Sequence, residues 1–481
     1  MHIILNPKYS FRSDDRRIII FDSIKDDGWL SFIHPLHAII LSYIGMFEDI
    51  SEAKLHLYHK FGIPQAVCDS FISKLLDNKE PTHVKYGEVN IAFPPETIIT
   101  STEFSKRNFE SIINECIDMN DVDLTTKRLY SGPDKIVFML TNKCAVKCNY
   151  CYADTYTQCN ELSYSEFCNI ITECKSIGVR RIELIGGDIF IKQNWDKYIS
   201  FLTKNQFNID FLSTKKPLNA NIIDKLIELK YSGFLQISLD SIDPIISKRL
   251  LNTACDYINQ IKESFDLLSN YPYLPFKVRI STVLCSANST YESIYQLFNF
   301  IQKYDFISRW EIGFAMQPFK PGNIQLCSNT QEYSAREIIE NIKTSHDHKF
   351  EIMLGLKGID KSPKGLLCLD KAANYRCSAN INSCFILPDG KVTLCERLYW
   401  NPNFIIGDLK INSLLNIWQS PQALFLAELE KSIDNTSPCF SCIGKKECYG
   451  KNKRCFVNVI SRHGTNSISY PDPSCIKSLS L

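Results

Sequence analysis

The stretch KIVFMLTNKCAVKCNYCYADTY (residues 135–156) joins a short apolar run directly to three closely spaced cysteines. The run KIVFML is rich in β-branched and apolar residues, as expected of a buried strand. The cysteines follow on a polar loop, at Cys144, Cys148 and Cys151. Tyr150 directly precedes the third of them, and the next cysteine, Cys159, lies beyond a further polar stretch. The sequence therefore predicts three thiolates on one loop, immediately after a strand.

Five more β-branched runs follow this strand, separated by helix-like segments such as SEFCNIITECKSIG. They span residues 179–185, 207–213, 234–240, 277–284 and 308–315. Repeated strand–helix units predict an α/β fold with a parallel sheet, curved into a partial (β/α)6 barrel or left open and doubly wound. Both forms bind ligands at the loops that follow the carboxyl ends of the strands. The cysteine loop lies at that edge.

Composition excludes several classes of protein. A chain of 481 residues with 44 % hydrophobic and 22 % charged content is long enough for about two to four domains. Its net charge of +1 predicts no steering toward nucleic acid or an acidic membrane surface. The N-terminus becomes charged too early for a secretory signal, and the most apolar window, residues 29–47, is interrupted by His34, Pro35 and His37. We therefore expect a cytoplasmic protein.

The chain contains twenty cysteines. Reducing compartments keep thiols free, so dense cysteine clusters in the cytoplasm point to metal binding rather than to disulfides. The cysteines crowd the last quarter of the chain, between residues 368 and 475. This asymmetry predicts a separate C-terminal metal domain.

Three thiolates on one loop can hold three corners of a cubane [4Fe-4S] cluster and leave its fourth iron without a protein ligand. A structural zinc site would instead use four ligands, usually from paired CxxC knuckles. The CxxxCxxC spacing, with an aromatic residue before the third cysteine and a position after the first strand of a βα repeat, resembles the radical S-adenosylmethionine (SAM) enzymes. In that family SAM chelates the open iron. One electron then cleaves SAM to methionine and a 5′-deoxyadenosyl radical, which abstracts a hydrogen from the substrate.

The resemblance implies roles for particular residues. Cys144, Cys148 and Cys151 match the cluster ligands, which makes them catalytic, and Tyr150 matches the aromatic residue that packs near the adenine of SAM.

Further implied SAM contacts lie at the ends of the next three strands. Gly186, Gly187 and Asp188 stand where the family usually has a Gly-Gly-Glu turn whose backbone receives the methionine amino group. Aspartate keeps the carboxylate but shortens its reach. Glycine permits close approach of a ligand to the backbone, although Gly-Gly is also a common plain turn. The last implied contacts, Ser213, Ser238 and Asp240, can equally be polar residues that end a strand.

A second cysteine pattern lies near the C-terminus. Cys377 is followed by Gly390 and Cys395, and CFSCIGKKEC (residues 439–448) precedes Cys455 and Cys475. This order resembles the seven-cysteine signature of the SPASM extension of radical SAM maturases. One gap departs from the family, because six residues separate the last two cysteines of the central run where the family usually has three. Zinc is the rival interpretation of this segment taken alone, since CxxC is also a zinc-knuckle spacing.

The family's interleaved assignment implies three [4Fe-4S] clusters, one that binds SAM and two auxiliary. The first auxiliary set would be Cys377, Cys384, Cys395 and Cys455, and the second Cys439, Cys442, Cys448 and Cys475. Cys384 lies outside the seven-cysteine signature; without it, the first auxiliary cluster keeps an open iron that can bind a substrate thiolate. Glu396 stands where some SPASM enzymes have an acidic residue proposed to take a proton from the substrate radical, which would make it catalytic. A solvated glutamate is the alternative.

The N-terminal residues predict one strand, three helices and a further β-prone segment. This arrangement resembles the small winged-helix domain with which many peptide maturases bind a leader peptide, by adding the extended leader to a sheet edge. A generic helical cap on the barrel is the alternative. The expected domains are residues 1–85 for leader recognition, a connecting segment 86–130, the radical SAM barrel 131–345 and the SPASM domain 346–481.

These resemblances imply an anaerobic radical SAM/SPASM oxidoreductase of the peptide-maturase type, similar to the maturases of Gly-Gly leader peptides. It would abstract a hydrogen from a ribosomally made precursor peptide and form a C–S or C–C crosslink. The implied partners are that peptide with its leader and an electron donor such as ferredoxin or flavodoxin, with no nucleic acid or membrane. Three alternatives stay open: maturation of a folded protein of the sulfatase type, a non-catalytic iron–sulfur relative that binds peptide or passes electrons, and a zinc-binding interaction protein.

Overall fold

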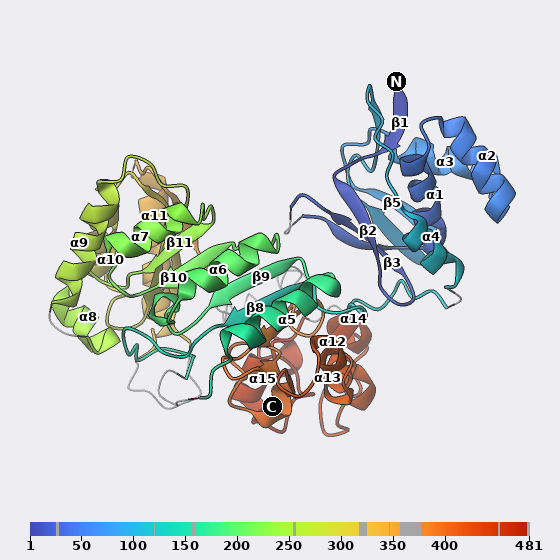
Figure 1. Cartoon of the computed structure of the whole chain (residues 1–481). Helices are drawn as coiled ribbons and strands as arrows, with labels where there is room; N and C mark the ends of the chain where they lie inside the picture. The colour runs from blue at the N-terminus through green and yellow to red at the C-terminus, as the bar shows by residue number, and fades with distance from the viewer. Residues whose placement is uncertain are drawn as a thin grey trace. The chain divides into compact units, whose positions relative to one another are not determined.

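The structure, a computed structural model, describes all residues except 26–27, 120, 155–158, 254–255, 317–324, 346, 356–376, 451–452 and 479–481. The chain forms two compact units, Met1–Gly132 and Pro133–Leu481 (Figure 1).

The first unit combines a small antiparallel sheet with a layer of helices. The sheet consists of β2 (Tyr9–Ser13), β3 (Ile18–Asp22) and β4 (Leu30–Ile33), with β3 in the centre. The three predicted helices are present as α1 (Pro35–Met46), α2 (Ile50–Phe61) and α3 (Gln65–Leu75). His34 and Asp49 cap the first two, because their side chains accept hydrogen bonds from backbone N–H groups at the helix starts. The sheet and the helices share one core, which includes Ile18, Ile20 and Ile40.

Residues 86–130, expected to be a connecting segment, are instead part of this unit. They contribute three elements, β6 (Val89–Phe93), β7 (Ile98–Ser101) and α4 (Glu110–Ile117). The first two pair antiparallel with β5 (Thr82–Tyr86) and β1 (His2–Leu5), respectively. Phe93, Ile98 and Ile113 are buried in the same core as α1. The pairing of β7 with the start of the chain is a long-range contact that no local pattern reveals.

Arg17 fastens the end of this segment to the sheet. Its guanidinium is fully buried, lies 2.8 Å from the Asp14 carboxylate and 3.4 Å from the centre of the Phe32 ring, and donates to the carbonyls of Thr126 and Arg128. The Asp14 carboxylate in turn accepts hydrogen bonds from residues 130 and 131. This buried ion pair thus holds residues 126–131, near the end of the first unit, against its sheet.

We expect Arg17→Met to destabilise the first unit by about 3–5 kcal/mol, because it leaves the Asp14 charge buried without its partner. Urea unfolding of the full chain, with limited proteolysis at residues 123–131, measures the change. Arg16→Met is the matched control, since Arg16 makes its ion pairs at the surface and its loss is expected to matter little. Equal sensitivity of the two variants would contradict this role of Arg17.

All six strands predicted for the barrel are present in the second unit. They are β8 (Lys135–Met139), β9 (Arg181–Ile185), β10 (Phe211–Thr214), β11 (Phe234–Ser238), β12 (Lys277–Leu284) and β13 (Ile307–Phe314). The helices between and after them are α5 (Tyr164–Ser176), α6 (Trp195–Lys204), α7 (Ala220–Glu228), α8 (Pro244–Leu251), α9 (Tyr257–Ser269), α10 (Tyr291–Ile301) and α11 (Asn329–Ser345). Two strands start later than predicted, β9 at Arg181 and β10 at Phe211. The start of β10 is displaced because the Phe207 N–H closes the end of α6 by donating to the Leu202 carbonyl.

The barrel strands form two hydrogen-bonded sheets. β10 to β13 are parallel neighbours in sequence order, and β14 (Glu351–Leu354) extends them. β8 and β9 are parallel to each other in the second sheet. β9 and β10 lie side by side without ladder pairing among the described residues, so the barrel is partial, as predicted.

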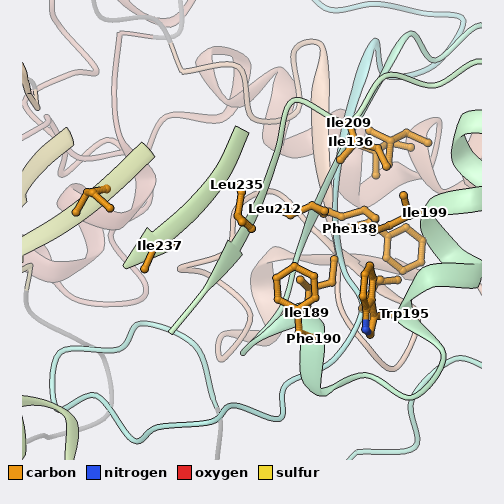
Figure 2. Close-up of a cluster of buried hydrophobic side chains, with 14 of the residues drawn as sticks. Ile136, Phe138, Ile189, Phe190, Trp195, Ile199, Ile209, Leu212, Leu235 and Ile237 are labelled. Carbon is orange, nitrogen blue, oxygen red and sulfur yellow. The ribbon is translucent and has the colours of Figure 1, made fainter. Parts of the chain in front are cut away.

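The two faces of these strands differ. The face toward the helices is apolar, and Figure 2 shows Ile136, Phe138 and Leu212 in one buried cluster with Trp195 and Ile199 of α6. The opposite face carries polar, half-buried residues in rows across neighbouring strands, such as Ser213, Gln236 and Arg279 or Ser238, Ser281 and Glu311. Alternation along each strand therefore separates a packed helical layer from a polar barrel interior.

The C-terminal residues continue the barrel sheet. β15 (Ser383–Ile386) pairs in parallel with β8, and β16 (Lys391–Thr393) and β17 (Ile405–Asp408) add antiparallel strands beyond it. Gly390, in the turn before β16, has a φ of +93° that favours glycine. Four helices follow, α12 (Leu414–Trp418), α13 (Pro421–Ala427), α14 (Lys445–Gly450) and α15 (Phe456–His463). The predicted metal domain is thus part of the same compact unit; its expected boundary, residue 346, lies outside the described residues.

Candidate functional site

The three predicted cluster ligands lie on one loop at the carboxyl end of β8. The last turn of α8 holds this loop, because the N–H groups of Lys147 and Asn149 donate to the carbonyls of Leu251 and Leu250 at 3.0 and 2.9 Å. Carbonyls in the last turn of a helix have no partner within the helix, so a neighbouring loop can satisfy them. Backbone bonds from another βα unit therefore set the position of the cysteines.

The donor set fits an iron–sulfur cluster. Cys144, Cys148 and Cys151 are all half-buried. Burial raises the pKa of all three thiols, that of Cys148 to about 12, and for Cys148 and Cys151 a neighbouring thiol adds to the effect. Three such cysteines on one loop can each ligate one iron of a cubane and leave the fourth iron without a protein ligand. Within the described residues no group of three His, Cys, Asp or Glu side chains is placed to hold a single metal ion.

The predicted glycine turn after β9 passes directly over the cysteine loop. The N–H of Gly187 donates to the Thr141 carbonyl at 2.7 Å, and the N–H of Asp188 donates to the Lys143 carbonyl at 2.8 Å. A Cβ on Gly187 would lie 2.2 Å from the Lys143 carbonyl oxygen, and one on Gly186 would lie 3.2 Å from that of Thr141. The close approach of these two backbone segments is by itself sufficient reason for the glycines.

Asp188, predicted as a SAM contact, uses its carboxylate inside the protein. It is fully buried and accepts hydrogen bonds from the Thr214 hydroxyl at 2.7 Å and from the N–H groups of Lys215 and Lys216 at 2.9 Å. Its other oxygen accepts from the Phe190 N–H at 3.1 Å. Burial raises the pKa of Asp188, and these hydrogen bonds oppose that rise. The carboxylate ties the end of β10 to the turn after β9.

Tyr150 and Asp240, two further predicted SAM contacts, are joined through Lys215. The Tyr150 hydroxyl donates to the Asp240 carboxylate, and the Lys215 ammonium lies 2.6 Å from that carboxylate and 5.6 Å from the centre of the Tyr150 ring. The Val283 N–H also donates to Asp240 at 2.9 Å. Burial raises the pKa of Tyr150 well above its ordinary value, and the Asp240 charge contributes. The ring beside the third cysteine is therefore fixed by a buried network.

The two predicted serines lie on the polar interior face of the barrel. The Ser213 hydroxyl accepts a hydrogen bond from the Gln236 amide at 2.9 Å. Ser238 stands beside Ser281 in the next strand, and its carbonyl lies 3.5 Å from the Lys215 ammonium. Both serines thus lie on strands that end at the same edge as the cysteine loop.

Three of the cysteines predicted for the first auxiliary cluster lie near one another. Burial and the adjacent Glu396 raise the pKa of Cys395 far above its ordinary value, and the Cys377 thiol adds to this rise, so the two thiols are close. Cys395 donates to the Glu396 carboxylate at 3.3 Å. Burial also raises the pKa of Cys455, and the charge of Arg397 opposes it, which places Cys455 beside the turn that carries Cys395.

Cys384, the fourth residue predicted for that set, lies elsewhere. It is in β15 with 1 % exposure, next to Ile136 of β8 in the sheet register. Its thiol is close enough to Cys174 of α5 to raise the pKa of that residue, after the larger effect of burial. The side chain therefore faces the helical layer. This position does not support its prediction as a ligand, and the reason is strand alternation: β15 turns Cys384 toward α5.

Three members of the second predicted set gather around α14. Burial raises the pKa of Cys448 to about 11, and the thiols of Cys439 and Cys442 contribute. The loop that carries Cys475 is held beside Cys455, because the Asp472 carboxylate accepts a hydrogen bond from the Cys455 N–H at 3.0 Å and the Asp472 carbonyl accepts one from the Cys475 N–H at 2.8 Å. The long gap before Cys455 begins within α14, which ends at Gly450.

Two residues near the cysteine loop were not predicted. Lys215 follows the Ser-Thr pair at the end of β10, and its position at the ligand-binding edge is the signal that could have identified it. Tyr152 directly follows the third cysteine and is 42 % exposed. Partial burial raises its pKa, and the charges of Glu396, Cys151 and Cys395 add to the rise. Separately, the described residues include no helix long and apolar enough to cross a membrane.

Family comparisons agree with this geometry. The sequence model of the radical SAM superfamily matches residues 138–301, which include the cysteine loop and five of the barrel strands. The model of SPASM, an iron-sulfur cluster-binding domain, matches residues 377–443. These matches confirm both predicted domains and imply SAM and [4Fe-4S] clusters as cofactors.

Curated relatives match the barrel part of the chain. A probable GTP 3′,8-cyclase from Methanococcus maripaludis is 27 % identical over 154 residues, which are 31 % of this chain and 50 % of that protein. The GTP 3′,8-cyclase of Campylobacter fetus is 27 % identical over 169 residues, 34 % of this chain and 50 % of that protein. The chain thus spans about half the length of the curated relatives it matches.

Solved structures match more of the chain. Streptococcus suis SuiB bound to S-adenosylmethionine has a TM-score of 0.66 at 16 % identity and covers 98 % of this chain and 100 % of its own. SuiB bound to the precursor peptide SuiA has a TM-score of 0.64 at 17 % identity, with the same coverage. Native anSMEcpe with AdoMet and the Kp18Cys peptide has a TM-score of 0.50 at 12 % identity and covers 72 % of this chain and 94 % of its own. These likenesses show a shared fold. The chain therefore contains a radical SAM domain followed by a SPASM iron–sulfur cluster-binding domain.

Proposed function

We propose that this enzyme modifies a ribosomally made precursor peptide by a SAM-derived radical and forms a C–S or C–C crosslink in it. The observation that carries the proposal is the order of parts: a small sheet-and-helix unit, a radical SAM barrel and a SPASM domain. The SuiB structures, one of them with a precursor peptide bound, share this fold across 98 % of the chain. The GTP 3′,8-cyclases match only about a third of the chain, so their likeness supports the barrel chemistry rather than their substrate.

The residues of the first site have separable tasks. Cys144, Cys148 and Cys151 would hold a [4Fe-4S] cluster with one iron open for SAM. When bound, SAM and the clusters supply a 5′-deoxyadenosyl radical and an acceptor for the electron that crosslinking releases. Tyr150, Gly186 and Ser238 would line the SAM site, together with Gly187, Ser213 and Asp240. Asp188 acts as a positioning residue, because its carboxylate is already occupied by protein donors.

The auxiliary cysteines would hold two further clusters. Cys377, Cys395 and Cys455 would hold the first, and the set Cys439, Cys442, Cys448 and Cys475 the second. With Cys384 in the core, the first keeps an open iron that suits a cysteine thiolate of the peptide. Bond formation at the peptide removes one hydrogen atom, one further electron and one proton; Glu396, beside Cys395, is placed to receive the proton.

Cys384→Ala is expected to leave the iron content of the reconstituted protein unchanged and to lower its stability by about 1–2 kcal/mol through loss of buried volume. Cys377→Ala is the matched variant and is expected to lose up to about four iron atoms per chain. Iron analysis and urea unfolding make the comparison. An equal loss of iron in the two variants would restore Cys384 as a ligand.

The first unit would bind the leader of the peptide. Beside the β5–β6 hairpin lies a groove of about 550 Å³, whose lining residues include Ile39, Phe61, Ile63 and Tyr86. In the described residues β5 pairs only with β6, so its outer edge is free to add an extended chain. Apolar leader side chains next to that edge would enter the groove.

The proposed chemistry also implies an electron donor and a cellular setting. The enzyme needs a one-electron donor such as ferredoxin or flavodoxin, an anaerobic setting and, because its many thiols must stay reduced, the cytoplasm.

An anaerobic assay tests the proposal. The full chain is reconstituted with iron and sulfide, its metals are counted, and 5′-deoxyadenosine is measured after SAM and dithionite are added. Three clusters predict about twelve iron atoms per chain. Short peptides encoded beside the gene are then added and followed by mass spectrometry for loss of two hydrogens. Modification of a full-size folded protein instead would support the sulfatase-type alternative. Bound iron without SAM cleavage would support the non-catalytic iron–sulfur relative. Bound zinc in place of iron would support the zinc-binding interaction protein.

A further inference from the structure

Arg454 directly precedes Cys455 and is buried, with 5 % of the residue exposed. A guanidinium keeps its positive charge at any physiological pH, and a buried charge normally has a charged partner and a full set of hydrogen bonds. Among the described residues no carboxylate forms an ion pair with Arg454, and its Nε has no hydrogen-bond partner. The SPASM domain thus contains a buried cation whose charge and Nε donor are left unsatisfied by the described protein groups.

Backbone carbonyls and an aromatic ring fix the position of this guanidinium. Its Nη2 donates to the carbonyl of Ile468 at 2.6 Å and to that of Tyr470. Its carbon Cζ lies 4.3 Å from the centre of the Tyr449 ring. Tyr449 directly follows Cys448 in α14, so the charge lies beside the helix that carries a cysteine of the second predicted set.

The same stretch of backbone also binds the segment of a second cysteine. The Ser469 carbonyl, between the two carbonyls that Arg454 holds, accepts hydrogen bonds from the Tyr449 hydroxyl at 2.7 Å and the Ser437 hydroxyl at 2.9 Å. The Ser437 oxygen in turn accepts from the Cys439 N–H at 3.1 Å. Hydrogen bonds therefore bring Arg454 and the Cys439 segment to the same short stretch of chain.

Two other charged side chains near this stretch have partners of their own. The Asp472 carboxylate accepts hydrogen bonds from the N–H groups of Cys455 and Ser474 and from the Ser474 hydroxyl. The Lys453 ammonium lies 3.2 Å from the Glu447 carboxylate, which is 51 % exposed. Neither group forms an ion pair with the buried guanidinium, so its charge calls for an anion beside it.

We propose that Arg454 is the charged partner of the second auxiliary [4Fe-4S] cluster. The ligands of that cluster would be Cys439, Cys442, Cys448 and Cys475. The inference rests on the proposed function, which assigns a cluster to these cysteines, and goes beyond it. A cluster with four thiolate ligands carries a net negative charge and its sulfur atoms accept hydrogen bonds, so it supplies both partners that Arg454 lacks. One-electron reduction adds a further negative charge, which a fixed cation favours.

The test isolates the second auxiliary cluster in the full chain. Cys148→Ala and Cys377→Ala together are expected to remove the other two clusters, and iron analysis checks that about four iron atoms per chain remain. In this background a redox titration followed by electron paramagnetic resonance gives the midpoint of the cluster that is left. Reconstitution is anaerobic, and circular dichroism checks the fold of each variant.

Two substitutions separate the charge from structural support. Arg454→Gln removes the charge but keeps an amide that can donate to the carbonyls; it is expected to make reduction about tenfold less favourable, which lowers the midpoint by about 59 mV for a one-electron couple. Arg454→Lys keeps the charge without the guanidinium fork and is expected to stay close to the background midpoint. Lys453→Met is the matched control, because it removes a neighbouring cation whose partner is the exposed Glu447.

Iron release gives a second measure in the otherwise wild-type chain, and it serves where the double-cysteine background holds no cluster. Without its cation, the anionic cluster is bound less tightly. Arg454→Gln is therefore expected to release about four iron atoms to a chelator several times faster than the wild type. Arg454→Lys and Lys453→Met are expected to release them at nearly the wild-type rate.

A midpoint that falls, or iron release that accelerates, in Arg454→Gln alone supports the inference. Unchanged values in every variant overturn it. Equal effects of Arg454→Lys and Arg454→Gln also overturn it, because the hydrogen bonds to the carbonyls, and not the charge, would then matter. If Cys439→Ala loses no iron, the proposed function itself fails at this site, whatever the Arg454 variants show, and the inference falls with it.

Discussion

Cys148→Ala is expected to abolish 5′-deoxyadenosine formation and to remove up to about four iron atoms per chain. Cys148 is the middle cysteine of the loop, and both neighbouring thiols lie within reach of its charge. With two of three ligands left, the loop no longer holds a cluster with a single open iron, so SAM has no chelating site. Product is measured by chromatography after anaerobic incubation with SAM and dithionite.

Cys168→Ala is the matched control for this variant. Cys168 is a half-buried cysteine of α5, so its loss removes a thiol without touching the predicted cluster sites. We expect wild-type iron content and wild-type product. Persistent 5′-deoxyadenosine in Cys148→Ala, or its loss in Cys168→Ala, would show that the loop is not the site of SAM cleavage.

Asp188→Ala is expected to lower stability by about 3–5 kcal/mol and to loosen the end of β10. The change leaves the N–H groups of Phe190 and Lys215 without an acceptor, and each unpaired buried group costs about 1–3 kcal/mol before local relaxation. The Lys216 N–H keeps the Thr214 hydroxyl as an acceptor at 2.9 Å, and that hydroxyl keeps the Lys216 carbonyl at 3.4 Å. Hydrogen exchange at the Lys215 and Lys216 amides, read by mass spectrometry, gives a local measure that does not depend on iron.

Asp243→Ala provides the comparison. Asp243 also accepts two backbone N–H groups, from Ile245 and Ile246, but it does so as the N-cap of α8 at a more exposed position. Its loss is expected to cost about 1 kcal/mol. If Asp188→Ala proves no more damaging than Asp243→Ala, the buried carboxylate is not the tie that holds the two strand ends together.

Local patterns in the sequence were sufficient for much of the fold. Each barrel strand is a short β-branched run bounded by polar residues, and such runs are recognisable because alternation and burial act on neighbouring residues. The same holds for the cysteine loop and for the helices of the first unit. The predicted start of β10 is wrong because Phe207 and Ile209 are apolar for another reason: they are buried where α6 ends.

Residues 86–130 show where local patterns stop. β7 pairs with β1 across most of the first unit, and Arg17 reaches carbonyls more than a hundred residues along the chain. No local pattern in the segment predicts these partners. Because of this long-range pairing, the predicted connecting segment is part of the core.

The residues of the candidate site also differ in whether the sequence or only the tertiary structure indicates their role. Spacing predicts the loop cysteines, whereas the two later cysteine groups, Cys384 among them, are what the resemblance to the SPASM signature implies. The register of β15 with β8 shows that the Cys384 side chain faces the helical layer. The contacts of Asp188 and Lys215 also appear only when the ends of β9, β10 and β11 meet.

By itself the sequence identified the radical SAM and SPASM domains, since the thiol spacing, the glycine turn and the alternating strands that carry the resemblance are local properties of the polypeptide. The tertiary structure alone decided which charges and carboxylates lie beside the cysteine loop. Asp240 comes from β11, Lys215 from the end of β10 and Tyr150 from the cysteine loop, and their contacts depend on how parallel strands converge at one edge of the barrel. Electrostatic interactions weaken with distance through space, not along the chain, and that is why folding was needed to place them.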